Sequence, residues 1–145
     1  MLYISGIFAL NLPCQLDTCG DWHQSSLDWQ KLRLHESEGS FFKEYGIERG
    51  HSVPEHTGLF CVANTIRACL DLLLESKFDL AQGMNEDFIG NDKYDIEIFK
   101  RVYEMRILNN FRYINDFMER EYRMKWINYK MRISKKNDLM ENLYA

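Results

Sequence analysis

Cysteine and histidine side chains, which bind metals and carry protons, gather in two segments of the sequence that have the composition of loops. They are spaced as C-x4-C-x3-H in the first segment and as H-x4-H-x4-C in the second. Zinc takes about four such ligands at the corners of a tetrahedron, so the two segments together would supply a site. The candidate ligands are Cys14, Cys19, His23, His51, His56 and Cys61.

These spacings differ from the usual zinc signatures. Neither segment contains a tight C-x2-C pair, and neither matches the HExxH or HxE–PCxxC patterns. In the alternative interpretation, Cys14, Cys61 and Cys69 are small buried hydrophobic residues and the histidines are polar loop residues. We favour this alternative and expect no cofactor, with zinc as the one exception to test.

Two carboxylate–histidine pairs in the same segments suggest acid–base chemistry. Asp21 and His23 flank Trp22, and Glu55 directly precedes His56. Histidine exchanges protons near neutral pH, and an adjacent carboxylate orients its ring. One alternative function is therefore a hydrolase-like enzyme that uses these two pairs, with or without zinc. We rank it below a binding role, because the sequence has no nucleophile elbow and no glycine-rich phosphate loop.

Charge is unevenly distributed along the chain. Residues 1–99 carry seven Lys and Arg against sixteen Asp and Glu, a net charge of −9. Residues 100–145 carry eleven Lys and Arg against six Asp and Glu, a net charge of +5. The basic residues of the last predicted helix are therefore candidates for contact with a partner: Arg112, Arg120, Arg123, Lys130 and Arg132.

Aromatic residues lie between these cations, a pattern typical of segments that neutralise phosphates and stack on bases. Most of the aromatic residues, however, fall on the apolar face of a helix and would point into the core. Acidic residues four positions before Arg120 and Arg123 have the spacing of helix ion pairs, which would neutralise part of the positive charge. We therefore expect a protein partner and keep a nucleic-acid-binding regulator as a second alternative.

The first part of the chain has the pattern of strands and loops. Residues 2–12 are rich in β-branched and aromatic side chains and predict a buried strand that ends at Pro13. Residues 14–26 predict a loop, and residues 27–34 predict a second strand. The glycines of residues 35–58 predict irregular backbone with short elements.

The rest of the chain has the period of helices. A helix is predicted over 61–76, with Asp71 on its outward side, and a short helix near 79–84. The longest apolar stripe lies between residues 111 and 133 and predicts one continuous last helix. Between these segments, Asp95 is the predicted N-cap of a helix with one apolar face, formed by Ile96, Phe99, Tyr103 and Ile107.

Together these elements predict an α+β fold, with a small N-terminal β-sheet region packed against a C-terminal layer of about three or more α-helices. We expect a single domain over 1–145. Residues 1–58 form its acidic, strand- and loop-rich part, and residues 59–145 form its helical part with a basic C-terminal helix. A chain of this length buries about 68% of its unfolded surface.

Composition excludes several classes of protein. Hydrophobic residues make up 46% of the 145 residues and aromatic residues 14%, which disordered chains do not reach. No segment has the ~18 consecutive apolar residues of a membrane span. The opening apolar run lacks the positive region of a secretory signal. We therefore expect a cytoplasmic location, reduced cysteines and no membrane contact.

These observations predict a small, non-enzymatic, cytosolic regulatory binding protein. Its expected partner is a macromolecule, and a protein before a nucleic acid. The profile is that of an antitoxin or an inhibitor of a defence nuclease from bacteria or phages, and it is also compatible with a homo-oligomer. The seven methionines and the abundant aromatic residues belong to the types enriched in the cores of protein interfaces.

Overall fold

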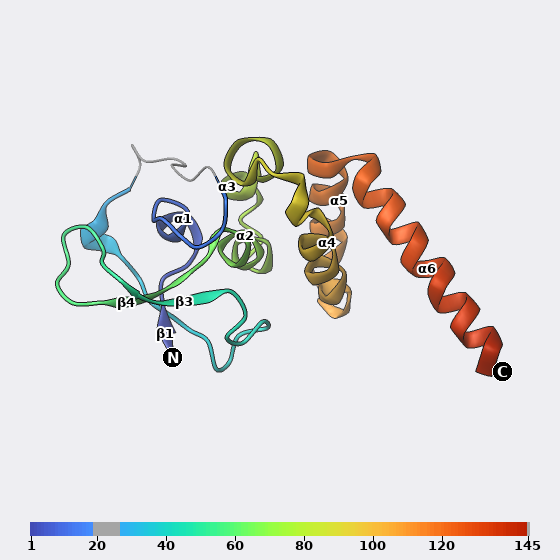
Figure 1. Ribbon diagram of the computed structural model, residues 1–145, viewed down its shortest axis with the longest axis horizontal. Coiled ribbons are helices and arrows are strands. Elements are labelled where there is room, and N and C mark those ends of the chain that lie inside the picture. Colours follow the sequence, from blue (N-terminus) through green and yellow to red (C-terminus); the bar gives the residue numbers. More distant parts are fainter. Residues whose placement is uncertain (19–26, 145) are drawn as a thin grey trace. The chain divides into compact units, whose positions relative to one another are not determined.

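The structure is a computed structural model that describes residues 1–18 and 27–144, with side chains up to residue 143. Short strands lie in the first part of the chain and longer helices in the last part (Figure 1), which confirms the predicted α+β class. The chain divides into two compact units, unit 1 (Met1–Asp92) and unit 2 (Lys93–Ala145). The single domain divided at residue 58 stays a prediction.

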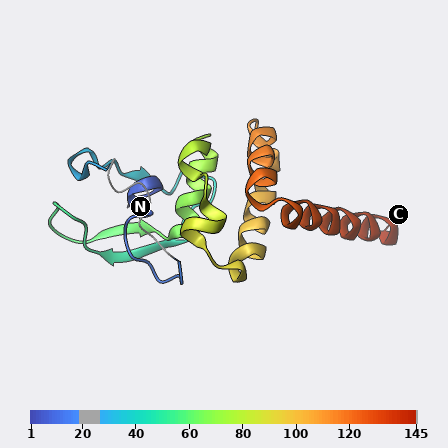
Figure 2. The same ribbon diagram turned by 90° about the horizontal axis from the view of Figure 1, so that it is seen from above.

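In the described part of unit 1, the strands form two antiparallel sheets of two strands each. β1 (Leu2–Tyr3) pairs with β2 (His35–Glu36). β3 (Ile47–His51) pairs with β4 (Phe60–Ala63), and Figure 2 shows these two strands side by side. All four strands are short, so the helices that follow supply most of the buried surface of this unit.

Backbone hydrogen bonds at Ile4 join the two sheets. The Ile4 amide donates to the Cys61 carbonyl at 2.9 Å, and the Ile4 carbonyl accepts from the Ala63 amide at 2.8 Å. The chain then turns at Gly6, whose φ is 60°, into the short helix α1 (Gly6–Ala9). The predicted strand over 2–12 is therefore wrong beyond this point, because a glycine with positive φ ends the extended backbone.

Residues 27–34 do not form the predicted strand. The Asp28 carboxylate accepts a hydrogen bond from the Gln30 amide at 3.0 Å, and this cap begins a 3₁₀ helix over Trp29–Lys31. An Asp side chain that captures a nearby amide competes with strand pairing. This prediction is wrong, and the next strand after β1 is β2, which begins at His35.

α2 (Thr65–Leu74) is the most buried helix of unit 1. Its N-cap is Asn64, whose side-chain oxygen accepts a hydrogen bond from the Arg67 amide at 2.9 Å. The helix predicted over 61–76 is confirmed within these bounds. Residues 61–63 belong instead to β4, because pairing with β3 continues up to the cap.

Two short helices follow α2. α3 covers Phe78–Ala81, so the short helix predicted near 79–84 is found with shifted bounds. A π-helix then covers Met84–Ile89. α2 packs against α1, α3, β4 and the π-helix. The core of unit 1 therefore surrounds α2 on several sides.

Three helices form most of unit 2: α4 (Asp95–Glu104), α5 (Phe111–Tyr122) and α6 (Met124–Tyr144). Phe99 of α4 is at the centre of an aromatic cluster to which all three helices contribute. Its ring centroid lies 5.0 Å from that of Tyr122, 5.6 Å from that of Trp126 and 5.5 Å from that of Tyr129. The apolar stripe predicted for the last helix therefore does face a core.

The single helix predicted over 111–133 is interrupted at Arg123. This residue has φ of 52°, in the left-handed region, and it separates α5 from α6. No glycine or asparagine marks the position, so the sequence carries no signal for the break.

The apolar face predicted for α4 is only partly correct. Ile96 and Ile107 are exposed, whereas Ile98 and Val102 are buried beside Phe99. Asp95 is the first residue of the helix and not its N-cap, which is Tyr94. The Asp95 carboxylate instead accepts a hydrogen bond from Lys125 Nζ at 3.4 Å.

We predict that Trp126→Ala lowers the free energy of unfolding by about 3–5 kcal/mol, because the indole is fully buried and its Nε1 donates to Asn115 at 2.9 Å. Thermal or denaturant unfolding followed by circular dichroism measures the change. Met131→Ala is the matched control on the same helix, since Met131 is exposed and should change stability little. An unchanged melting temperature for Trp126→Ala would contradict the aromatic core.

Candidate functional site

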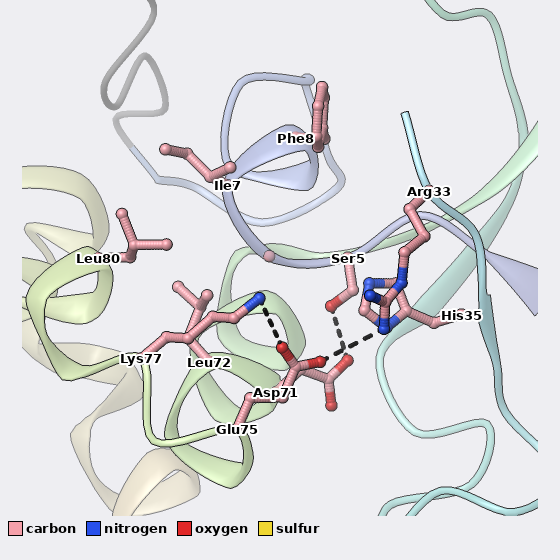
Figure 3. A pocket seen from close by; sticks show the side chains of 11 residues that line it. Ser5, Ile7, Phe8, Arg33, His35, Asp71, Leu72, Glu75, Lys77 and Leu80 are labelled. Atoms are coloured by element: carbon pink, nitrogen blue, oxygen red, sulfur yellow. Dashed lines mark hydrogen bonds and ion pairs between the residues drawn. The ribbon is translucent and has the colours of Figure 1, made fainter. Parts of the chain in front are cut away.

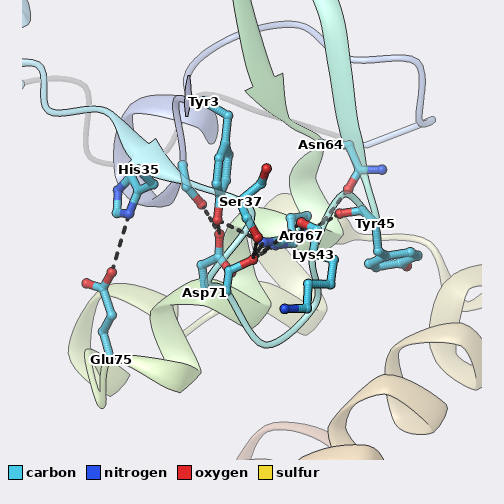
Figure 4. A network of polar contacts seen from close by, with 11 residues as sticks. Tyr3, His35, Ser37, Lys43, Tyr45, Asn64, Arg67, Asp71 and Glu75 are labelled. Carbon is cyan, nitrogen blue, oxygen red and sulfur yellow. Dashed lines mark hydrogen bonds and ion pairs between the residues drawn. The ribbon is translucent and has the colours of Figure 1, made fainter. Parts of the chain in front are cut away.

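The most buried charge of unit 1 is the Arg67 guanidinium, which has no solvent exposure (Figure 4). Its Nε donates to Asp71 Oδ1 at 2.9 Å, four residues further along α2. The other four donors reach two carbonyls and two hydroxyls: Lys43 O at 2.8 Å, Tyr45 O at 2.7 Å, Tyr3 Oη at 2.8 Å and Ser40 Oγ at 3.0 Å. All five donors of this side chain therefore have acceptors.

The Asp71 carboxylate is satisfied in the same way. Its Oδ2 accepts from the Tyr3 hydroxyl at 2.7 Å and from Ser5 Oγ at 2.6 Å. Burial, and then the hydrogen bond to Asp71, raises the pKa of the Tyr3 hydroxyl above its ordinary value. Tyr3 therefore stays protonated as a donor at neutral pH, and this cluster has the properties of a structural network.

The apolar periodicity of this helix predicts Asp71 on its outward side, which is wrong, and it gives no sign of the network. Asp71 is 5% exposed, because Lys43, Tyr45 and their neighbours cover the side of α2 that periodicity alone assigns to solvent. An Arg and an Asp four residues apart inside an otherwise apolar helix was the signal available in the sequence.

The described histidines of the two loop segments have separate partners. His51 Nε2 lies 2.9 Å from Glu48 Oε1, and His56 Nε2 lies 2.7 Å from the Trp29 carbonyl. Glu55 accepts a hydrogen bond from Gln30 Nε2 at 3.4 Å. These contacts do not build an acid–base pair from Glu55 and His56.

The described cysteines are free thiols. Cys14 Sγ lies 3.4 Å from the Thr65 hydroxyl, and Cys61 is half-buried in β4. Within residues 1–18 and 27–144, no group of three or more His, Cys, Asp and Glu side chains could hold a metal ion. Cys19, Asp21 and His23 lie outside the described residues, so the zinc site and the Asp21/His23 pair stay predictions.

The basic residues predicted to contact a partner all lie in unit 2. Arg112, Arg120, Arg123 and Arg132 are exposed. Lys130 differs from them, because its Nζ donates to Asn115 Oδ1 at 2.6 Å and to Glu119 Oε1 at 3.2 Å. Lys130 therefore helps to hold α6 against α5.

The acidic neighbours of the arginines do not have the pairings that helix spacing predicts. Glu119 pairs with Lys130 across the two helices. In the part of the chain that the structure describes, neither Arg120 nor Arg123 forms an ion pair within 4.0 Å with the acidic residue four positions before it. Both arginines are therefore exposed at the surface without the predicted pairing.

Exposed apolar side chains are concentrated in unit 2. Of the eleven large hydrophobic residues that are exposed among those described, eight belong to this unit. Four of the eight lie in α6 from residue 131 onward, and this helix continues beyond the predicted end at residue 133: Met131 at 53%, Leu139 at 65%, Met140 at 45% and Leu143 at 77% exposure. We call these four residues and the cations between them the α6 surface.

Comparisons with family models, with curated proteins and with solved structures find no match to this chain. Among the described helices, none combines the length and the apolar character needed to cross a membrane.

We predict that Arg67→Ala lowers the free energy of unfolding by about 3–5 kcal/mol, because it leaves the Asp71 carboxylate buried without its counter-charge. Arg49→Ala is the control, since Arg49 is exposed and should change stability by less than about 0.5 kcal/mol. Urea unfolding of the two variants measures the difference, and equal stability of both would contradict the network.

Gly46→Ala gives an independent test of the same network. A Cβ at Gly46, whose φ is 70°, would lie 2.7 Å from Arg67 Cβ, so we expect it to destabilise unit 1. Gly50→Ala is the matched control, because it has a similar φ of 77° but no heavy atom within 4 Å of the added carbon. If both variants lost the same free energy of unfolding, the loss would come from the positive φ and not from contact with Arg67.

For the zinc prediction, we expect no stoichiometric metal in protein purified without chelators, because the described histidines and cysteines do not form a cluster of ligands. Elemental analysis of the full chain measures it. About one equivalent of zinc, lost in a Cys14→Ser variant, would show that residues 19 and 23 complete a site with the described ligands.

Proposed function

We propose that this chain is a non-enzymatic regulatory protein that binds another protein through the α6 surface. The observation that carries the proposal is the exposure of Leu139, Met140 and Leu143 together on one helix. Contiguous apolar residues at the surface mark interaction sites, whereas singly exposed ones do not. An amphipathic helix that places such residues in a groove of its partner is a common mode of protein recognition.

The spacing of the side chains puts the cations on the same face. Arg132 precedes Leu139 by seven residues and Lys136 precedes Leu143 by seven, so in each pair the two side chains lie on one side of the helix. The whole helix, residues 124–144, carries five Lys and Arg against two Asp and Glu, a net charge of +3. A partner with an apolar groove and an acidic rim matches this surface.

A protein partner is favoured over a nucleic acid by the placement of the aromatic residues. Tyr122, Trp126 and Tyr129 are at most 8% exposed and are therefore not available to stack on bases. Tyr113 is exposed, but the Arg112 guanidinium lies 5.1 Å from the centre of its ring. The charged surface alone would give salt-sensitive, sequence-independent binding.

A role as an antitoxin or as an inhibitor of a defence nuclease agrees with a small protein that acts by covering a surface of its target. Such a role needs no cofactor and no catalytic group in this chain. In this role, unit 2 is the part of the chain that contacts the target.

The test is purification of the full chain with its bound molecules from its native cell, followed by binding measurements on the identified partner. The double variant Met140→Glu/Leu143→Glu should weaken binding at least about tenfold, because it puts charge into the apolar contact. Ile107→Glu is the matched control, since Ile107 is 78% exposed in the same unit but lies outside α6. Both variants should keep the parental melting temperature.

Three outcomes would contradict the proposal. The double variant could bind as well as the control, which would exclude the α6 surface. Tight, salt-tolerant binding of a defined oligonucleotide would favour the nucleic-acid alternative, because phosphate contacts weaken between about 50 and 200 mM salt. A dimer that the same substitutions dissociate would assign the α6 surface to self-association.

A further inference from the structure

A cavity of about 110 Å³ opens in unit 1 beside the Arg67–Asp71 network, and it lies entirely among residues of that unit (Figure 3). Its polar side chains come from three places in the chain. Ser5 follows β1, Arg33 lies just before β2 and His35 begins it, and Glu75 and Lys77 follow the end of α2. The position therefore depends on the tertiary fold and not on any local motif.

The acidic groups that line the cavity are already engaged. Both Asp71 oxygens accept hydrogen bonds, from Arg67 at one oxygen and from Tyr3 and Ser5 at the other. Glu75 Oε2 lies 2.8 Å from Lys77 Nζ, and Glu75 Oε1 lies 3.7 Å from His35 Nδ1. A ligand in this cavity therefore meets few acceptors that lack a partner.

The hydrogen-bond donors that line the cavity, in contrast, outnumber its acceptors that lack a partner. Arg33 lines the cavity, is exposed, and makes no hydrogen bond or ion pair among the residues that the structure describes. The Lys77 ammonium has three N–H donors and uses one of them in its ion pair with Glu75. Figure 3 shows the amino end of Lys77 on one side of Ser5 and the side chains of Arg33 and His35 on the other. This arrangement suits a ligand that accepts hydrogen bonds and carries negative charge.

The remaining walls are apolar. Ile7, Phe8, Leu72 and Leu80 line the cavity, and Phe8 is held by an edge-to-face contact with Trp29 at 5.2 Å between ring centroids. A cavity of about 150 Å³ holds a benzene molecule, so the present one, which opens to the surface, encloses only part of a ligand of that size. A planar carboxylate with a short aliphatic part fits both the size and the mixed walls.

We propose that this cavity is a binding site for a small aliphatic carboxylate. The guanidinium of Arg33 and the ammonium of Lys77 hold the carboxylate, and Ile7, Phe8 and Leu80 surround its aliphatic part. The site belongs to unit 1 and is separate from the α6 surface of unit 2, so it adds a ligand to the proposed function and does not depend on that function.

The experiment is a titration of the isotope-labelled full chain with butyrate, followed by nuclear magnetic resonance. We expect saturable shifts in the millimolar range at the backbone amides of residues 5–8, 33–35 and 75–77. Arg33→Gln should weaken binding about tenfold through loss of charge-assisted hydrogen bonds, and Lys77→Gln should weaken it also. Arg49→Gln, an exposed arginine outside the cavity, is the matched control and should bind as the parent does.

Two further probes test the charge and the aliphatic part of the ligand separately. Butylamine has the same aliphatic part with the opposite charge and should cause no saturable shift. Inorganic phosphate has the charge without the aliphatic part and should bind more weakly than butyrate. Equal binding of butyrate by Arg33→Gln and the parent, binding of butylamine, or tighter binding of phosphate would each overturn the proposal.

Discussion

Burial of the Arg67 charge is the constraint on which the rest of unit 1 depends. A guanidinium without solvent exposure is tolerated only when its donors find acceptors and its charge finds a counter-charge. Here one carboxylate, two backbone carbonyls and two hydroxyls fill those roles. The acceptors come from β1, α2 and the loop before β3, so one side chain fixes three segments that share no continuous sheet.

Unit 2 is held by a different kind of interaction, the packing of aromatic rings around Phe99. This core follows from periodicity, because Tyr122, Trp126 and Tyr129 continue one apolar stripe, and the stripe was predicted from the sequence. The break at Arg123 was not predictable in the same way. A positive φ is uncommon for a residue other than glycine, and no residue type at or near Arg123 marks the position.

The parts of the fold that the sequence did not predict are those decided by single local contacts. Gly6 turns an apolar run into α1, and the Asp28 cap turns an expected strand into a 3₁₀ helix. The candidate functional residues also include some that the sequence predicts and some that it does not. The basic character of the last helices was predictable from the charge distribution. The cavity was not, because it joins Arg33, His35 and Lys77 from elements that have no common pattern in the sequence.

The length of α6 has a consequence for how it would meet another molecule. Starting a helix is unfavourable, since the first turn orders several residues for one hydrogen bond, but each later residue extends it at little penalty. Trp126, Tyr129 and Lys130 anchor the beginning of α6 and so supply that first turn. The exposed end therefore extends a helix that has already started, and it needs no nucleation of its own. A bound partner would have little backbone left to order, and less of the binding energy would be lost to entropy.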